Sequence, residues 1–463
     1  MERAAMNPNG QRPVRHVAII GAGFSGALQA INLLRHEGPS ATLIERRGHL
    51  ARGVAYSAAH PDHLLNVRAA NMSALPDDPG HFARWLAATH PEHADGFAPR
   101  IVYGDYLGEL LGNAARSAPQ RLAIRSGEAV DVAFSPDGAT VQLADGSQIA
   151  ADAVILAPGN LPPHQPPELA AAALDPDLYA PDPWAGDIAE GLADDDVVLV
   201  IGSGLTMVDV ALLLDARGFR GRIIALSRRG LLPRAHAPIP PSPTPRLSER
   251  PSLCATELLG FVRDRAEAIG WRAAVDELRP YTQDMWLAAA PEDRGRFLRH
   301  LRPWWDVHRH RLAPQVAARV AALQASGRLE VVAGKLASVS ANGRTTRVAW
   351  RARGRDDLVE VATRRIVNCS GPQGDLNRTA EPLLRALIDR GLIQPDPLRL
   401  GIQVNQQAEV IDATGNANPR LLALGPMTRG AFWEIVAVPD IRVQTWSVAR
   451  RLSNAHWVGG EGL

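Results

Sequence analysis

The chain has 463 residues, of which 46% are hydrophobic, and a formal net charge of +1. This length predicts two or three domains with sizeable cores, and the small net charge indicates no general attraction to nucleic acid or acidic membranes. The two cysteines, Cys254 and Cys369, are far apart and form no Cys-x-x-Cys pair, which disfavours a redox dithiol and a cysteine-based metal site.

Two parts of the sequence bear on export and membrane insertion, and neither favours them. The first dozen residues are polar and lack the apolar core of a secretory signal. The most membrane-like stretch, 197–214, is interrupted by Gly202, Ser203, Gly204 and Asp209, so a nucleotide-binding strand and helix explain it better than a span. We expect a cytoplasmic protein.

A dinucleotide-binding fingerprint begins the ordered part of the sequence. The apolar run 17–20 predicts a buried parallel strand, and 27–35 has the pattern of a helix. Between them, Gly21 permits a tight turn, Gly23 lets the backbone approach a pyrophosphate, and Gly26 allows close packing of helix on strand. Because strand, glycines and helix occur in the required order, we favour a nucleotide site over a glycine-rich turn without a ligand.

The next strand predicts which nucleotide the first fingerprint binds. Residues 41–44 form a second apolar strand that ends at Glu45. A carboxylate at this position accepts hydrogen bonds from ribose hydroxyls and repels a ribose 2'-phosphate. We therefore expect FAD or NAD at this site and not NADP.

The segment after Glu45 is long and has no clean periodicity. It contains 53–57, 63–67 and 71–75, in which polar side chains alternate irregularly with small and apolar ones. Such a loop favours a position beside a ligand, and the alternative is a packed loop without one. Helices are predicted over 81–88 and 100–111, the second with tyrosines at core spacing.

Short strands follow the second of these helices. Alternating residues between 122 and 156, with turns at 136–138 and 145–146, predict hairpins. The last strand ends in a turn of small residues at 157–159, and the proline-rich stretch 161–183 is interpreted as a linker.

A second fingerprint follows this linker. Strand 197–201 leads into Gly202-Ser203-Gly204 and an apolar helix to Leu214, with Met207 in the place of the third glycine. The next strand, 222–226, ends in Ser227-Arg228-Arg229 instead of an acid. A hydroxyl and two guanidiniums suit a 2'-phosphate, so NADPH is favoured over NADH, and the alternative is a solvated basic turn.

The remaining third of the chain is expected to complete both domains. Helices are predicted to about residue 323, followed by strands over 329–353 and 365–367 and a turn at 368–372. His308 and His310 point apart on a helix and are not expected to share a metal. Near the end, a strand over 420–424, a glycine turn and a helix from Pro439 to about Leu452 resemble the way flavin-binding proteins contact the pyrimidine edge.

Taken together, the motifs resemble those of the YdhS-like FAD/NAD(P)-binding proteins, within the two-dinucleotide flavoprotein superfamily that contains flavin monooxygenases. The most specific segments are 53–57, 64–73, 305–314 and 425–442. Two departures are Pro426, where an aspartate often follows the late glycine, and the lack of a Phe-x-Gly-x-x-x-His motif of Baeyer–Villiger enzymes.

The resemblance implies an α/β protein with two Rossmann-like dinucleotide-binding domains of three layers and a helical insert. The FAD domain is expected over 14–190 and 375–463, and the NADPH domain over 191–374 with an insert at about 240–323. Asn66, Asn71 and Ser73 are predicted to serve the reaction. The residues predicted to contact the cofactors are Gly21, Gly23, Phe24, Ser25, Gly26, Glu45, Arg46, Gly53, Asn66, Val67, Met72, Ala157, Gly159, Gly202, Gly204, Thr206, Ser227, Arg228, Arg229, Gly425, Trp433 and Glu434.

The leading functional hypothesis is an NADPH-dependent FAD monooxygenase that uses molecular oxygen, through a flavin C4a-(hydro)peroxide, on an amine or another small nucleophile. One alternative is an FAD-dependent dehydrogenase or oxidase of a small metabolite. Another is a flavin-bearing redox sensor or binding protein without catalysis. The substrate and the oligomeric state stay open.

Overall fold

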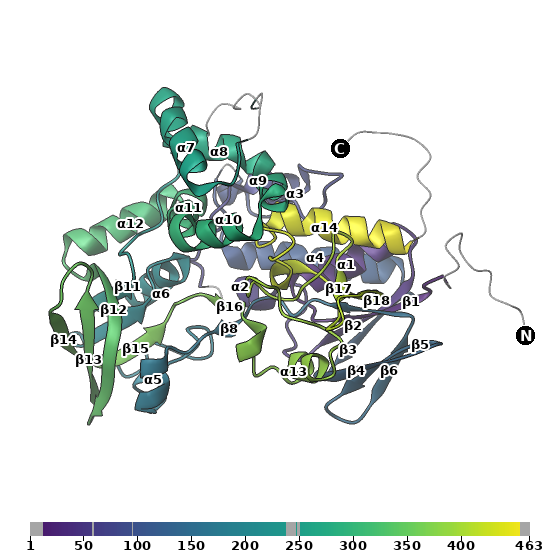
Figure 1. Ribbon diagram of the computed structural model, residues 1–463, viewed down its shortest axis with the longest axis horizontal. Helices are drawn as coiled ribbons and strands as arrows, with labels where there is room; N and C mark the ends of the chain where they lie inside the picture. Colours follow the sequence, from purple (N-terminus) through teal and green to yellow (C-terminus); the bar gives the residue numbers. More distant parts are fainter. Residues whose placement is uncertain (1–12, 58–59, 95, 238–246, 248–250, 454–463) are drawn as a thin grey trace, which may run out of the picture. The chain divides into compact units, whose positions relative to one another are not determined.

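The computed structural model describes residues 13–57, 60–94, 96–237, 247 and 251–453 (Figure 1). Their contacts divide the chain into two compact units. The first unit contains Met1–Ala58, Arg68–Leu161 and Gly374–Leu463, and the second contains Ala59–Val67 and Pro162–Gln373. Both ends of the chain therefore build the first unit.

The first unit contains a sheet, a small meander and the helices around them. Its strands are β1 (His16–Ile20), β2 (Ser40–Glu45), β3 (Leu122–Ser126), β4 (Ala129–Ser135), β5 (Gly138–Leu143), β6 (Gln148–Ala151), β7 (Ala153–Leu156), β17 (Glu409–Ile411) and β18 (Ala417–Ala423). Its helices are α1 (Phe24–Arg35), α2 (Gly53–Ser57), α3 (His81–Thr89), α4 (Arg100–Ser117), α13 (Pro382–Asp389) and α14 (Val438–Leu452), with short 3-10 turns at Ala69–Asn71, Pro91–His93, Leu376–Arg378 and Gly425–Met427.

The main sheet of the first unit has the order β17-β18-β7-β1-β2-β3. All its pairs are parallel except β17 with β18. Residues 17–20 of β1 are buried, as expected for a parallel strand that is covered on both faces. The predicted hairpins are confirmed by the antiparallel meander β4-β5-β6, whose apolar side chains join β7 and α13 in one core.

Helix α1 packs against α4 and α14, which lie far from it in the sequence (Figure 1). Residues 25–34 of α1 are all buried, including Asn32, whose Nδ2 donates to Thr445 Oγ1 of α14 at 3.2 Å. The predicted helix at the end of the chain is therefore confirmed, and its function in the fold is to cover α1.

The second unit contains a sheet and most of the helices between residues 161 and 373. Its strands are β8 (Leu161–Pro163), β9 (Tyr179–Ala180), β10 (Val197–Ile201), β11 (Arg222–Ser227), β12 (Leu329–Asn342), β13 (Thr345–Ala352), β14 (Leu358–Thr363), β15 (Arg365–Asn368) and β16 (Pro372–Gln373). Its helices are α5 (Pro167–Ala172), α6 (Leu205–Ala216), α7 (Ala255–Ile269), α8 (Trp271–Leu278), α9 (Thr282–Ala288), α10 (Pro291–Arg296), α11 (Arg302–Arg309) and α12 (Pro314–Ala325), with a 3-10 turn at Arg279–Tyr281 and a π-helical turn at Phe297–Leu301.

The sheet of the second unit has the order β14-β13-β12-β11-β10-β15-β9. Strands β12, β11, β10, β15 and β9 run parallel, and β13 and β14 continue the sheet as antiparallel strands. The predicted helical insert is confirmed by α7 to α11, which Figure 1 shows grouped together in teal. The proline-rich residues 238–246 and 248–250 lie outside the described residues.

The interpretation of 161–183 as a linker is wrong. Strand β9 pairs with β15, and Leu169 of α5 and Tyr179 of β9 are buried in the core of the second unit. Prolines here lie at the start of a short helix and at a sheet edge, where a missing N–H is tolerated. The second unit thus begins near residue 162 and not near 191, and it also takes residues 59–67 from the long loop.

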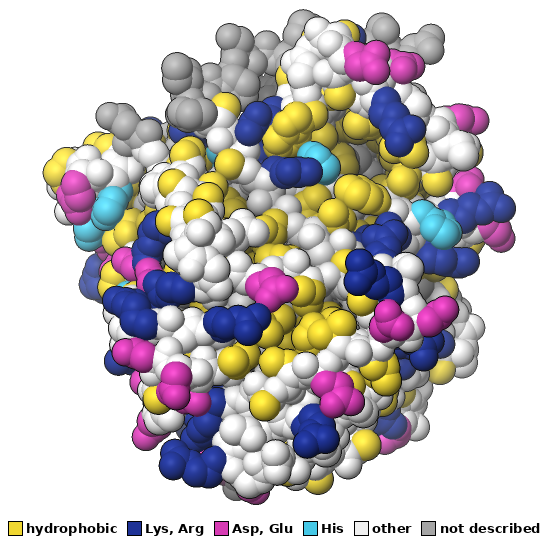
Figure 2. Space-filling view, turned by 90° about the vertical axis from the view of Figure 1, so that its left-hand side faces the viewer, with side chains coloured by type: hydrophobic (Ala, Val, Ile, Leu, Met, Phe, Trp, Pro, Cys, Tyr) yellow, Lys and Arg dark blue, Asp and Glu magenta, His cyan; other side chains and the backbone are white. Residues whose placement is uncertain are grey.

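Basic and acidic side chains are interspersed on the face of the molecule that Figure 2 shows. Among the described residues, no helix is both long and apolar enough to cross a bilayer.

The contact between Asn32 and Thr445 provides a test of how α14 stabilises the first unit. Thr445→Val keeps the side-chain shape but removes the hydroxyl, which leaves the Asn32 amide buried without this partner at a cost of about 1–3 kcal/mol. We expect a lower midpoint of thermal unfolding, measured by circular dichroism. Thr445→Ser is the control, because it keeps the hydroxyl. Equal midpoints for Thr445→Val and the unaltered protein would show that the hydrogen bond is unimportant.

Candidate functional site

The first glycine turn connects β1 to α1. Gly21 has a φ of +99°, and a Cβ there would overlap Ala157 O at the end of β7. A Cβ on Gly26 would overlap Gly21 O, so this glycine lets α1 begin directly over the turn. Gly23 precedes α1, and no side chain caps the helix. The turn therefore leaves the N–H groups of the first helical residues available to an anion.

Glu45 lies at the end of β2, next to this turn. Its Oε2 accepts from the N–H of Ala22 at 2.9 Å, and its Oε1 accepts from the N–H of Arg47 at 2.8 Å. These two bonds orient the carboxylate while each oxygen keeps a lone pair for a ribose hydroxyl. Arg46 is held in ion pairs with Glu128 and Glu381, and its hydrogen bond to Glu381 raises the pKa of the guanidinium.

Further predicted residues gather around the same turn. A Cβ on Gly23 would lie 3.4 Å from the Cα of Gly53, so the backbones of the two glycines approach each other closely. A Cβ on Gly425, which has a φ of +76°, would overlap Ser25 Oγ. Gly159 has a φ of +69° and open space beside it. The structure therefore brings turns from four parts of the sequence to the N-terminus of α1.

The predicted reaction residues of the long loop differ in their surroundings. Ser73 is fully buried, and its hydroxyl donates to Asp78 O at 2.6 Å, so it holds the loop together. Met72 is also buried. Asn71 is exposed, and none of its side-chain atoms has a hydrogen bond among the described residues. Of Asn71 and Ser73, only Asn71 has a side chain without hydrogen bonds to the described residues, so only its side chain is available to contact a substrate.

Asn66 and Val67 belong to the second unit, although the sequence predicted them for the flavin domain. Asn66 O accepts from His236 Nε2 at 3.0 Å, and the neighbouring His63 Nε2 donates to the backbone of Asp209 at 3.0 Å. Arg319 of α12 binds Asp62 at 2.7 Å. Sequence position alone could not show this exchange, because these bonds join residues more than a hundred positions apart.

Trp433 and Glu434 follow the late glycine turn and are both buried. The guanidinium of Arg429 lies 4.3 Å from the centre of the Trp433 ring. Sequence reasoning missed Gln444 of α14, whose Oε1 accepts from the N–H of Gly425 at 2.8 Å and whose Nε2 donates to Thr428 Oγ1 at 3.1 Å. These bonds set the conformation of the turn, and no local pattern signals them.

The second glycine turn, between β10 and α6, repeats the plan of the first. Gly202 has a φ of +114°, and a Cβ there would overlap Cys369 O at the end of β15. Gly204 precedes α6 without a side-chain cap, and Thr206 lies in the first turn of the helix. Met207, which replaces the third glycine, is fully buried. Burial raises the pKa of the Cys369 thiol, so this cysteine stays protonated.

The end of β11 presents the predicted phosphate-binding residues. Ser227 Oγ accepts from the N–H of Gly230 at 3.0 Å. Because the single proton of the Ser203 hydroxyl goes to Leu231 O at 2.6 Å, the Ser227 hydroxyl donates to Ser203 Oγ at 2.8 Å. Arg228 is exposed and forms no ion pair with the described residues. Arg229 Nη2 donates to Arg299 O at 3.3 Å. The Arg228 guanidinium is thus available to an anion, and the Ser227 hydroxyl is held at the same strand end.

The histidine pair of the insert has no metal-binding arrangement. His308 Nδ1 donates to Trp304 O at 2.8 Å, and the His308 ring lies against Trp271. Within the described residues, no group of three His, Cys, Asp or Glu side chains could hold a metal ion.

Comparisons with known proteins agree with this geometry. A family model described as FAD-NAD(P)-binding matches residues 18–161. No curated protein sequence is a recognisable relative of the chain.

Three solved structures share the fold across nearly the whole chain. Ornithine hydroxylase from Pseudomonas aeruginosa has a TM-score of 0.65 at 14% identity, over 95% of this chain and 99% of that one. The FAD-bound cadaverine monooxygenase of Erwinia amylovora has a TM-score of 0.68 at 12% identity, over 96% and 95%. Thioredoxin reductase from T. acidophilum has a TM-score of 0.53 at 13% identity, over 95% and 98%. The fold is therefore that of flavoproteins with two dinucleotide-binding domains, which confirms the predicted fold class.

The residues of the first turn fit FAD. The uncapped N-terminus of α1 suits a pyrophosphate, and the space between Gly23 and Gly53 would be narrowed by any Cβ on either residue. The oriented Glu45 carboxylate suits the ribose. The second turn shares the positive-φ glycine and the uncapped helix N-terminus, so the turn at Gly202 and Gly204 fits the pyrophosphate of a nicotinamide dinucleotide.

The two glycines of the second turn provide a matched test. Gly202→Ala places a methyl group against Cys369 O at a positive φ, so we expect the second unit to lose about 2 kcal/mol or more of stability. At Gly204, φ is −86° and a Cβ would have no other atom within 4 Å. The free energy of unfolding of Gly204→Ala should therefore differ from that of the unaltered protein by no more than about 0.5 kcal/mol. Urea unfolding measures the stability of both variants, and equal losses of stability would contradict the turn geometry described above.

Proposed function

We propose that this protein is an NADPH-dependent, FAD-containing monooxygenase that acts on an amine or another small nucleophile. The observation that carries the proposal is a difference in charge: an acidic side chain lies beside the first glycine turn and a basic side chain lies beside the second. Glu45 stands beside the first turn, and Ser227 with Arg228 stands beside the second. A carboxylate suits the free ribose of FAD, whereas a hydroxyl and a guanidinium suit a 2'-phosphate.

In this proposal Gly21, Gly23, Gly26 and Glu45 hold FAD, and Gly202, Gly204 and the Ser227 to Arg229 segment hold NADPH. FAD, when bound, supplies hydride acceptance from the nicotinamide and a reaction with molecular oxygen once reduced. The chain's own residues bind and orient the nucleotides through backbone N–H groups and the two strand ends. No catalytic triad or metal centre is needed for such chemistry.

The amine substrate class rests on the fold comparison and on the long loop. Two of the similar structures are described as an ornithine hydroxylase and a cadaverine monooxygenase, and both names denote oxygenation of molecules that carry amino groups. In this chain, the exposed Asn71 amide has no hydrogen-bond partner among the described residues and is available to a substrate. Ser73 is assigned to holding the loop, because its hydroxyl is engaged there.

The test of the proposed function is anaerobic reduction of the purified flavoprotein by NADPH and, separately, by NADH. We expect NADPH to bleach the flavin absorbance faster. Admitting oxygen together with a panel of amines should then yield hydroxylated product with little release of hydrogen peroxide. Rapid peroxide release with every amine would favour an oxidase. If neither nicotinamide reduces the flavin, the assignment of the second turn is wrong.

Arg228→Gln tests the preference for NADPH separately. The change removes a charged partner of the 2'-phosphate, and we expect the dissociation constant of NADPH to rise about tenfold, which corresponds to about 1.4 kcal/mol. The constant for NADH, which lacks this phosphate, should stay the same. Both constants can be measured from the rate of flavin reduction at increasing nicotinamide concentration.

Arg351→Gln is the matched control for this measurement. Arg351 is another exposed arginine of the second unit, on β13, and forms no ion pair with the described residues. Its replacement changes net charge by the same amount and should leave both constants unaltered. Equal effects of the two substitutions would indicate a general electrostatic effect. That result would remove Arg228 from the site.

A further inference from the structure

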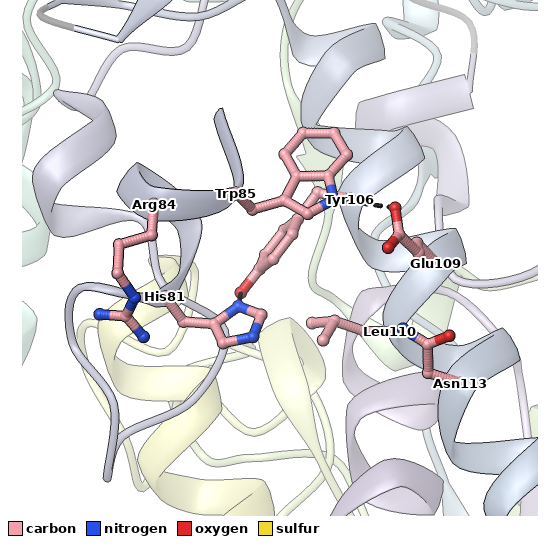
Figure 3. Close-up of a pocket in the computed structure, with 7 residues that line it drawn as sticks. All are labelled: His81, Arg84, Trp85, Tyr106, Glu109, Leu110 and Asn113. Atoms are coloured by element: carbon pink, nitrogen blue, oxygen red, sulfur yellow. Dashed lines mark hydrogen bonds between the residues drawn. The ribbon is translucent and has the colours of Figure 1, made fainter. Parts of the chain in front are cut away.

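A pocket of about 310 Å³ lies between α3 and α4 of the first unit, outside the predicted cofactor residues (Figure 3). His81, Arg84 and Trp85 come from α3, and the facing side chains come from α4. The α4 residues are Tyr106, Glu109, Leu110 and Asn113. The volume is at the lower end of the range for small-molecule sites.

The pocket contains one uncompensated charge. Arg84 Nη2 is paired with Asp78 at 2.5 Å, so these two charges cancel. Glu109 Oε2 accepts from Trp85 Nε1 at 2.8 Å, but no basic side chain of the described residues forms an ion pair with Glu109. Arg116 contacts Asn113 Oδ1 and is not among the lining residues. The lining therefore carries a net negative charge at Glu109.

Tyr106 contributes a neutral phenol to the pocket. Its Oη accepts from the N–H of Ala74 at 3.3 Å and lies 3.1 Å from His81 Nδ1. Burial raises the pKa of Tyr106 to about 12, so the phenol keeps its proton.

The aromatic wall beside Glu109 is held in place by other rings. Trp85 stacks on Phe82 with ring centres 6.1 Å apart, and its ring centre lies 5.4 Å from that of Tyr106. Phe82 is fully buried, and the Trp85 indole is further fixed by its bond to Glu109. The Glu109 carboxylate is thus fixed at the N–H edge of the Trp85 indole, in a pocket that the Tyr106 ring also lines. A carboxylate held in this way is a preorganised partner for a cation, because little conformational freedom is lost on binding.

We propose that this pocket binds a small organic ammonium cation, with Glu109 as its charge partner and Trp85 and Tyr106 as its aromatic walls. Among the described residues, only Oε2 of Glu109 has a hydrogen-bond partner, and Leu110 offers an apolar surface to alkyl groups. The site shares no residue with the two glycine turns. The proposed ligand site can therefore be tested independently of the proposed flavin chemistry.

The probe for this site is choline, whose quaternary nitrogen has no hydrogen to donate and no lone pair to oxygenate. Ligand-observed NMR on the full chain should show broadening of the choline methyl signal on binding. The neutral isostere 3,3-dimethylbutan-1-ol has the same shape without the charge and should bind much more weakly. Equal binding of the two compounds would show that the pocket selects only apolar shape and would overturn the proposal.

Two substitutions locate the binding. Glu109→Gln keeps the acceptor for Trp85 but removes the charge, and we expect choline affinity to fall about fivefold. Glu360→Gln is the control, because Glu360 is an exposed carboxylate on β14 of the second unit without an ion pair among the described residues. Trp85→Ala should also weaken binding, provided that circular dichroism shows an unchanged fold.

The outcomes separate this site from others. If Glu109→Gln leaves the affinity for choline unchanged, choline binds at another place on the protein, and this result contradicts the proposal. Competition by acetate but not by sodium would indicate an anion site and would equally overturn it. Loss of binding in Glu109→Gln with an unchanged rate of flavin reduction by NADPH would support the pocket while leaving the flavin chemistry unaffected.

Discussion

Both nucleotide turns depend on the approach of a strand-end carbonyl to a glycine that has no Cβ. Ala157 O occupies the space beside Gly21 in the first unit, and Cys369 O occupies the space beside Gly202 in the second. Because each carbonyl belongs to a parallel strand next to the one that precedes the turn, the turn can form only where the sheet is complete. The helix that follows then begins over the end of the sheet without a capping side chain, and its free N–H groups are available to a phosphate.

The two units use this common frame with different chemistry at the next strand end. In the first, backbone N–H groups orient the Glu45 carboxylate. In the second, Ser203 and Gly230 hold the Ser227 hydroxyl beside Arg228, which forms no ion pair with the described residues. The same backbone geometry thus carries different side chains at the corresponding strand end of each unit, and in the proposed function these side chains set the nucleotide selectivity.

Aromatic residues of the first unit are concentrated behind α1. Tyr103 of α4 packs against Phe24, Phe82 and Tyr106, and the series continues to Trp85 at the pocket between α3 and α4. In a chain with only 5% aromatic residues, such a cluster gives α3 and α4 a rigid contact surface. The rigidity explains how a shallow pocket can keep its aromatic walls and its carboxylate in fixed positions.

Local patterns in the sequence determined much of the fold. The apolar strands, the glycine spacing and the hairpin turns were enough to predict β1, α1, β2, β10, α6 and β11, because each depends on neighbours within about 30 residues. The charge at the two strand ends, Glu45 and Arg228, could also be predicted. Only the tertiary structure decided that 162–183 belongs to the second unit, with β9 in its sheet, and that Asn66 is held by His236. It also decided that Gln444 sets the turn at Gly425 and that Glu109 binds the indole N–H of Trp85. These arrangements join segments through buried hydrogen bonds and ring contacts, and such contacts have no periodicity that a sequence can display.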